Sequence, residues 1–157
     1  MQDYFQINQK APANDPQRAC NKSGNALWAD DHATHWIGMT LDHVDEGAAT
    51  LGLVITRNHC NGHGMCHGGM IFALADSAFA FACNSRNQAT VAQHNSINFI
   101  ASAQIGDHLT ATATEVSLTG RSGIYDVRVT NQTGKVIAEM RGMSRTIKGQ
   151  LFPEDAA

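Results

Sequence analysis

The most apolar stretch of the chain runs from residue 70 to residue 83, where only Asp76 and Ser77 are polar. Its Ala, Phe, Leu and Met residues leave no continuous polar face at helical spacing, and a helix of this kind is either buried or spans a membrane. Because spanning a bilayer takes about 20 apolar residues, this stretch is too short. We therefore predict a central helix over residues 67–86, wrapped by the rest of the protein.

The boundary residues of this stretch support the helix, which Gly68 and Gly69 open and Asn84 and Ser85 close. Its carboxylate, Asp76, is unusual because an ion buried without a partner is costly. Such a residue is paired, kept neutral or used in chemistry. The ordinary alternative is a hydrogen-bonded aspartate of the core.

Strand-like alternation of apolar and polar residues occurs on both sides of this helix. Before it, residues 36–42 and 49–56 alternate with period two, and the turn at residues 45–47 joins them into a hairpin. After it come four segments rich in Val, Ile, Thr, Tyr and Phe, at residues 89–101, 107–118, 123–130 and 135–148. Short connections require these strands to be antiparallel, because a parallel return needs a long crossover. The pattern predicts an α+β fold in which an antiparallel sheet curls around one long central helix.

The two ends of the chain differ from this pattern. Residues 1–25 are polar and contain few large apolar groups, so we predict a flexible N-terminal extension, followed by a short helix over residues 25–33. Residues 26–149 form a single domain, and residues 150–157 form a polar C-terminal tail.

Composition narrows the class of protein. A chain of 157 residues is long enough for one domain with a real core. The net charge of -3 and the absence of a basic run predict no nucleic-acid partner. The polar start carries no apolar signal segment, so we expect no membrane partner and a cytoplasmic protein. The four cysteines include no Cys-x-x-Cys pair, which favours free thiols in a reducing compartment.

One motif carries a specific resemblance. Residues 61–80, NGHGMCHGGMIFALADSAFA, resemble the signature of the phenylacetic-acid-degradation thioesterases, a branch of the hotdog-fold acyl-CoA thioesterases. The similarity covers about residues 30–148 and continues through the segments INF at 97–99, GDHL at 106–109, GIYDV at 123–127 and RGMS at 141–144.

The resemblance implies hydrolysis of phenylacetyl-CoA or a ring-hydroxylated relative to the free acid and CoA, without a cofactor beyond the CoA of the substrate. It implies that Asp76 is the catalytic carboxylate, as general base or as nucleophile. It further implies that the Gly68 amide polarises the thioester carbonyl and that Asn61 positions the reacting groups. His67 is expected to orient the glycine-rich loop that precedes the helix (residues 59–67) or to contact the substrate.

Helix geometry adds a prediction about assembly. Gly68 and Gly69 occupy the first turn, where amide groups lack an internal partner and the helix dipole is positive, so they can stabilise a developing oxyanion. Asp76 lies eight residues after Gly68, about 12 Å along the helix axis. One chain is therefore not expected to bring both groups to one bond. We predict a homo-oligomer, a dimer or a dimer of dimers (homotetramer), with active sites shared between chains.

The sequence identifies residues that bind the CoA part of the substrate less specifically than it identifies the motif residues. Arg121 with Ser122, and Arg145, are candidates for its phosphates, each with the alternative of a solvated strand residue. Gly69 allows close approach of the substrate, and Ser77 orients water or bonds to the helix backbone. The family often has an Arg-Pro pair after the position of Phe99, where this chain has Ile and Ala.

Three alternatives stay open at the level of sequence. The loop contains five residues of the types that bind zinc, but it is a glycine-rich segment without a second Cys-x-x-Cys pair, so we expect no metal. A hotdog-fold hydratase or dehydratase, or a non-catalytic acyl-CoA-binding module, would also use this fold. The five zinc-type residues are His59, Cys60, His63, Cys66 and His67.

Overall fold

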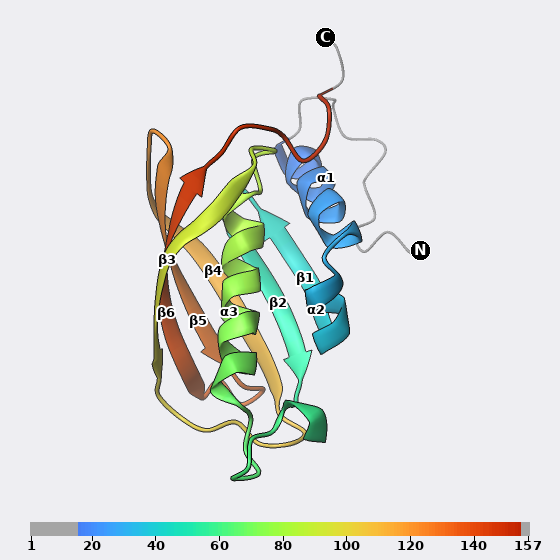
Figure 1. The fold of residues 1–157 in the computed structure, drawn as a ribbon, viewed down its shortest axis with the longest axis vertical. Helices are drawn as coiled ribbons and strands as arrows, with labels where there is room; N and C mark the ends of the chain where they lie inside the picture. The colour runs from blue at the N-terminus through green and yellow to red at the C-terminus, as the bar shows by residue number, and fades with distance from the viewer. Residues whose placement is uncertain (1–15, 155–157) are drawn as a thin grey trace.

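A six-stranded antiparallel sheet curves around one long helix in the computed structural model, which describes residues 16–154 (Figure 1). The strands lie in the order β1-β2-β4-β5-β6-β3, and every neighbouring pair is antiparallel. The predicted α+β architecture is therefore confirmed. The elements are α1 (Pro16–Ala29), α2 (His32–Ile37), β1 (Met39–Asp45), β2 (Ala48–Val54), the 3-10 helix η1 (Arg57–His59), α3 (Gly68–Cys83), β3 (Thr90–Phe99), β4 (His108–Thr119), β5 (Ser122–Thr130) and β6 (Val136–Thr146).

The central helix α3 begins at Gly68, with His67 as its N-cap, and ends at Cys83, so it is slightly shorter than predicted. The curved sheet covers most of its circumference, and the side chains on that side are buried. A stripe that includes Ala73, Asp76 and Ala80 is only half-buried. The helix is therefore not wrapped on every side, and its carboxylate lies on this half-buried stripe.

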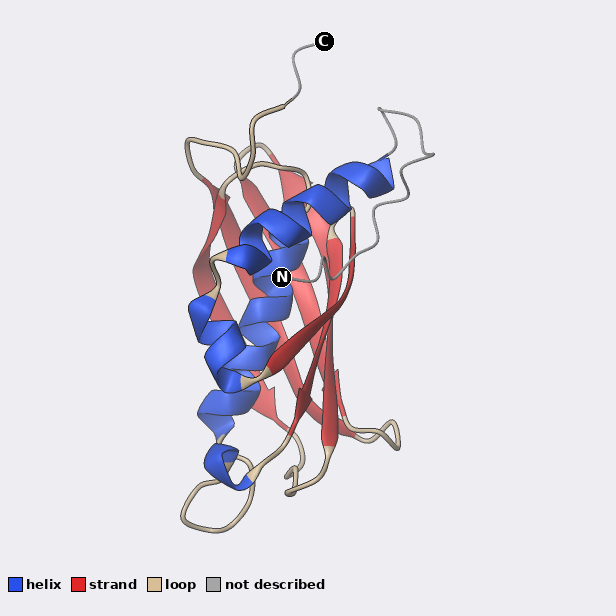
Figure 2. Ribbon diagram, turned by 90° about the vertical axis from the view of Figure 1, so that its right-hand side faces the viewer, coloured by secondary structure: helices blue, strands red, loops and turns tan. Residues whose placement is uncertain are grey.

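The N-terminal segment differs from its prediction. The single short helix expected at residues 25–33 is replaced by α1 and α2, and residues 16–25 are helical rather than a flexible extension. Cys20 and Trp28 of α1 are buried, and Gln17 Nε2 donates a hydrogen bond to the Val44 carbonyl at 2.8 Å. This packing holds α1 against β1 (Figure 2). The rest of the predicted extension, residues 1–15, lies outside the described residues.

The strands occur where the alternation predicted them, with two differences. Residues 36 and 37 end α2 instead of starting β1, because Gly38 takes the left-handed conformation (φ 86°) that terminates the helix. The strand after α3 does not lie beside the next strand in the sequence. β3 forms the far edge of the sheet, where it pairs only with β6.

The C-terminal segment is irregular, and its described part, residues 147–154, is held against the fold. Asn87 Oδ1 accepts hydrogen bonds from the amides of Leu151 and Phe152, both at 3.1 Å. No helix in residues 16–154 is long and apolar enough to cross a membrane.

The core beneath α3 predicts a large stability effect. Phe79 is fully buried, with its ring centroid 5.4 Å from that of Tyr125 in an edge-to-face arrangement. We expect Phe79→Ala to lower the free energy of unfolding by about 3–5 kcal/mol, through lost burial and a cavity. Val116→Ala, at a side chain that is 53% exposed, should change it by less than about 0.5 kcal/mol. Denaturant unfolding at one protein concentration measures both, and equal effects would contradict this assignment of the core.

Candidate active site

The carboxylate of Asp76 faces β3, the edge strand of the sheet. Asn95, on β3, donates a hydrogen bond from Nδ2 to Asp76 Oδ1 at 2.5 Å. Burial raises the pKa of Asp76 above its ordinary value, and the bond from Asn95 opposes that shift by stabilising the charged form. Asp76 is therefore an oriented carboxylate in a partly desolvated setting, which suits a general base or a nucleophile.

Asn95 is a functional candidate that the sequence reasoning missed. Its Oδ1 is buried and has no hydrogen-bond partner among the described residues. Gly142 lies opposite Asn95 on β6, and a Cβ at Gly142 would lie 2.9 Å from both Asn95 Oδ1 and the Phe79 ring. Gly142 thus provides the space in which the Asn95 amide turns toward Asp76. Strand alternation could have placed Asn95 on an inner face, but not beside Asp76.

The start of α3 leaves one backbone amide available. His67 Nδ1 accepts the Gly69 N–H at 2.8 Å, and the His67 carbonyl accepts the N–H groups of Met70 and Ile71 at 2.9 and 3.3 Å. The Gly68 N–H has no recorded partner in the part of the chain that the structure describes. Of the first helical amides, that of Gly68 is therefore the one free to bind an oxyanion.

His67 acts as a cap in this geometry. Because Nδ1 accepts a hydrogen bond, the neutral ring carries its proton on Nε2. Its bond to Gly69 also means that the Gly69 amide is already occupied. The Phe99 ring lies over Gly68, where a Cβ would meet its Cζ at 3.2 Å.

Asn61 belongs to a small hairpin that leads into α3. Its amide donates to the Met65 carbonyl at 2.8 Å, and its Oδ1 accepts the His63 N–H at 2.9 Å. The His67 N–H donates to the His59 carbonyl at 2.8 Å, which closes the base of the hairpin. The hairpin thus brings Asn61 and the start of α3 into one region.

Ser77 points in another direction from Asp76. Its Oγ lies 3.4 Å from Thr34 Oγ1 on α2, and Thr34 Oγ1 donates to Asp31 Oδ2 at 2.6 Å. Ser77 therefore joins a hydrogen-bonded chain on the α2 side of the helix, whereas Asp76 faces β3.

The predicted CoA-binding residues gather at the opposite end of the sheet from Gly68. Arg121 donates from Nε and Nη2 to the Thr146 carbonyl at 3.2 and 2.9 Å, and Arg145 Nη1 donates to Ser122 Oγ at 3.3 Å. Arg145 is paired with Val91, eight residues from Phe99 along β3, or about 26 Å. Within one chain, the structure does not bring these residues to the Gly68 amide.

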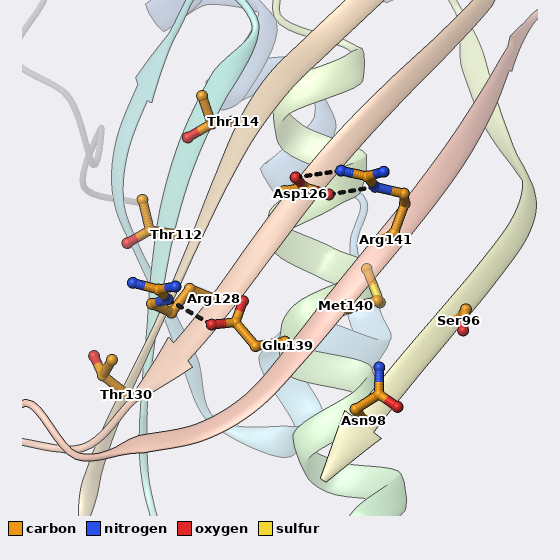
Figure 3. A pocket seen from close by; sticks show the side chains of 10 residues that line it. All are labelled: Ser96, Asn98, Thr112, Thr114, Asp126, Arg128, Thr130, Glu139, Met140 and Arg141. Carbon is orange, nitrogen blue, oxygen red and sulfur yellow. Dashed lines mark hydrogen bonds and ion pairs between the residues drawn. The ribbon is translucent and has the colours of Figure 1, made fainter. Parts of the chain in front are cut away.

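A hollow of about 490 Å³ lies on the outer face of the sheet, away from α3 (Figure 3). Arg141 donates to both oxygens of Asp126 at 2.7 Å, and Arg128 donates to Glu139 at 2.6 Å. The charged residues of the hollow are paired with each other, and the sheet lies between the hollow and Asp76. The hollow is therefore not part of the candidate site.

Both ring nitrogens of His59, one of the zinc-type residues, form hydrogen bonds with the backbone. His59 Nδ1 accepts the Thr56 N–H at 3.1 Å, and its Nε2 donates to the Ile37 carbonyl at 2.9 Å. No group of three or more His, Cys, Asp or Glu side chains within residues 16–154 is arranged to hold a metal ion.

Comparisons with known proteins agree with this fold. The model of the thioesterase superfamily matches residues 63–138. Acyl-coenzyme A thioesterase PaaI of Escherichia coli (strain K12) is 38% identical over 133 residues, covering 85% of this chain and 95% of that protein. The structure of E. coli PaaI matches with a TM-score of 0.85 at 37% identity, covering 87% of this chain and 99% of that chain. A mutant of the phenylacetic acid degradation protein PaaI from Thermus thermophilus gives a TM-score of 0.71 at 32% identity, with coverages of 73% and 98%.

The fold is that of a hotdog-fold thioesterase. The chain belongs to the thioesterase superfamily, with PaaI among its relatives, and it is a thioester hydrolase. The resemblance to the phenylacetic-acid-degradation thioesterases is therefore confirmed.

Loss of the Asn95 hydrogen bond should change the pH dependence of catalysis. In Asn95→Leu the number and branching of the side-chain heavy atoms are kept, but the bond that lowers the pKa of Asp76 is lost. A base must be ionised, so the acid limb of the kcat/KM profile should move to higher pH. We also expect kcat to fall about tenfold or more, because a hydrogen bond to a charged group contributes about 1.5–3 kcal/mol.

Thr114→Leu is the control, since Thr114 is an exposed residue of β4, away from the β3 edge, whose side chain lines the outer hollow (Figure 3). Its pH profile should equal that of the unmodified protein. An unshifted acid limb in Asn95→Leu would contradict the role assigned to Asn95.

Proposed function

We propose that the enzyme hydrolyses acyl-CoA thioesters with an aryl-acetyl acyl group, phenylacetyl-CoA or a ring-hydroxylated relative, to the free acid and CoA. One observation carries the proposal: the oriented carboxylate of Asp76 and the free Gly68 amide are the two groups that thioester hydrolysis requires. The names of the E. coli and Thermus relatives support CoA esters and phenylacetic acid degradation as the chemical context.

The reaction follows from these two groups. The Gly68 N–H, at the positive end of α3, stabilises the negative charge that develops on the thioester oxygen. Asp76 either takes a proton from the attacking water or attacks the carbonyl to form an anhydride that water then opens. The C–S bond breaks and CoA leaves as its thiol. Asn61 positions the reacting groups, and His67 holds the helix start in shape.

The active site is shared between two protomers. Gly68 and Asp76 belong to one regular helix and are about 12 Å apart along its axis. Two antiparallel α3 helices would place Asp76 of one protomer near Gly68 of its partner. A two-fold axis meets this need because it creates two equivalent sites.

The proposed dimer interface is the free edge of the sheet, formed by β3. β3 pairs with β6 on one side only, and Val91 and Phe99 on it are 45% and 54% exposed. An open edge of this length favours pairing with another strand. Along β3, Asn95 lies beside Asp76 and Phe99 beside Gly68, so an axis near Ile97 would set Asp76 against the partner's Gly68. A dimer of dimers would be built from this unit.

The substrate extends from this site in two directions. A hollow of about 380 Å³ beside Met70, in the first turn of α3, is a place for the acyl group, because Trp36, Ile37 and Val54 give it apolar walls. The CoA phosphates reach toward Arg121, Ser122 and Arg145 of the protomer that supplies Asp76, because Val91, which pairs with Arg145, is only four residues from Asn95 along β3. Gly69 leaves room for the substrate at the helix start. Ser77 stabilises the position of α3 through its hydrogen bond with Thr34 on α2.

The remaining properties follow from composition and chemistry. The four cysteines are free thiols, which supports a reducing, cytoplasmic compartment. The mechanism needs no cofactor besides the CoA of the substrate and no metal, and it involves neither nucleic acid nor a membrane.

Thiol release tests the reaction and its carboxylate together. We expect the unmodified enzyme to release CoA faster from phenylacetyl-CoA than from acetyl-CoA or crotonyl-CoA. In Asp76→Asn the rate should fall by about 10³-fold or more, because the base or nucleophile is lost while the shape is kept. A thiol reagent follows the release, and calorimetry follows CoA binding. Binding of CoA esters without release from any of them would favour the binding module instead.

Complementation tests whether the site is shared. Asp76→Ala removes the carboxylate, and Gly68→Pro removes the amide hydrogen. Proline suits the first helical position, and His67 already has the extended conformation (φ -66°, ψ 134°) that a following proline requires. Each homodimer should be inactive. A heterodimer purified through two different tags should recover about half of the normal activity, because one of its two sites is intact.

Gly68→Ala is the matched control, because it adds the same Cβ near Phe99 but keeps the N–H. It should retain far more activity than Gly68→Pro. Purified heterodimers that stay inactive would rule out a shared site.

A further inference from the structure

Cys60 and Cys66 face each other across the hairpin that leads into α3. They form an isolated antiparallel bridge pair. The flanking hydrogen bonds run from the Asn61 N–H to the Met65 carbonyl and from the His67 N–H to the His59 carbonyl, both at 2.8 Å. Because the bonds lie on either side of the pair and not within it, Cys60 and Cys66 occupy a non-hydrogen-bonded position of an antiparallel ladder.

Such a position has the dimensions of a disulfide. Residues in non-hydrogen-bonded pairs have Cα atoms about 4.5 Å apart, with side chains on the same face of the ladder. Disulfides span Cα separations of about 4.4–6.8 Å. The backbone therefore holds the two cysteines at a bridgeable distance while both are thiols.

The present side-chain contacts are weak. Cys60 Sγ donates to the Thr56 carbonyl at 3.5 Å, and Cys66 Sγ donates to the His67 carbonyl at 3.7 Å. A thiol is a poor donor, so turning both sulfur atoms toward each other breaks no strong hydrogen bond. The ladder bonds that pair the two segments involve backbone atoms and stay in place.

We propose that Cys60 and Cys66 are a site of reversible covalent modification, at which a low-molecular-weight disulfide such as oxidised glutathione converts the two thiols into a cross-strand disulfide. This site is separate from the thioester chemistry and does not depend on the proposed function. Disulfides in the cytosol are usually transient, which fits a reversible pair.

The two thiols have different parts in the reaction. Cys60 is half-buried, whereas Cys66 is only 5% exposed, so Cys60 meets the reagent. The Cys60 thiolate attacks one sulfur of oxidised glutathione, forms a mixed disulfide and releases one glutathione as its thiol. Cys66 then loses its proton and attacks the Cys60 sulfur, which releases the second glutathione. Two protein thiols are oxidised, and one glutathione disulfide is reduced to two thiols.

The environment of Cys66 supports this order. Burial, with smaller contributions from Cys60 and Asp107, raises the pKa of the Cys66 thiol to about 11. Its thiolate is therefore scarce at neutral pH, and an external reagent cannot reach it easily. Attack within the hairpin is still accessible, because Cys60 is its direct neighbour on the paired segment.

The other two cysteines serve as internal references. Cys20 and Cys83 are buried on α1 and α3, and burial raises their pKa values to about 11 and about 12. Neither forms a bridge pair with a second cysteine in the described residues. They should remain thiols when the folded protein meets the reagent.

Intact mass and peptide mapping after treatment of the full-length folded protein with oxidised glutathione test the proposal. The unmodified protein should lose two hydrogens, about 2 Da, without keeping an adduct, and a peptide linked through Cys60 and Cys66 should disappear with dithiothreitol. Cys66→Ser should stop at one glutathione adduct on Cys60. Cys60→Ser should form neither the bridge nor an adduct, and Cys83→Ser should behave as the unmodified protein.

Three outcomes would overturn the proposal. A stable glutathione adduct on the unmodified protein would mean that Cys66 does not complete the bridge. A bridge to Cys20 or Cys83, or no mass change at all, would show that the hairpin pair is not the reactive site. Circular dichroism of each variant establishes that it is folded, so an unfolded variant cannot be mistaken for an unreactive one.

Discussion

Burial of α3 against the sheet is the constraint on which the rest of the structure depends. The helix is apolar around most of its circumference, and the inner faces of β2, β4 and β5 cover most of that surface with residues such as Val127 and Val129. A carboxylate on the covered side would pay a large desolvation penalty. Asp76 instead lies on the half-buried stripe beside the edge strand β3, so the packing of the core leaves this carboxylate only partly desolvated.

The contact between α3 and β3 involves both groups of the proposed active site. Asn95 bonds to Asp76 from β3, and Phe99 on the same strand covers Gly68 at the helix start. The same strand is an open edge of the sheet. Asp76 and Gly68 both lie beside this edge strand. In the proposed dimer, association through β3 would therefore also complete the active site.

The hairpin before α3 fixes the start of the helix. His67 caps α3 and occupies the Gly69 amide, which leaves the Gly68 amide unpaired among the residues that the structure describes. Asn61 and the pair of Cys60 and Cys66 belong to this hairpin. Local backbone pairing therefore determines which helix amide is available and which thiols are neighbours.

Much of this structure can be predicted from the sequence because periodicity reports which residues are buried. The central helix and the strand segments follow from spacing, and the motif at residues 61–80 is the source of the roles proposed for Asp76 and Gly68. Pairing partners are non-local, so the sequence does not reveal that β3 joins β6, that Asn95 meets Asp76, or that Arg145 lies far from Gly68. Helix α1 was missed because its polar composition hides the few residues, such as Trp28, that it buries. Local patterns assign a residue to a face, whereas contacts between distant segments depend on how the whole sheet is ordered and curved.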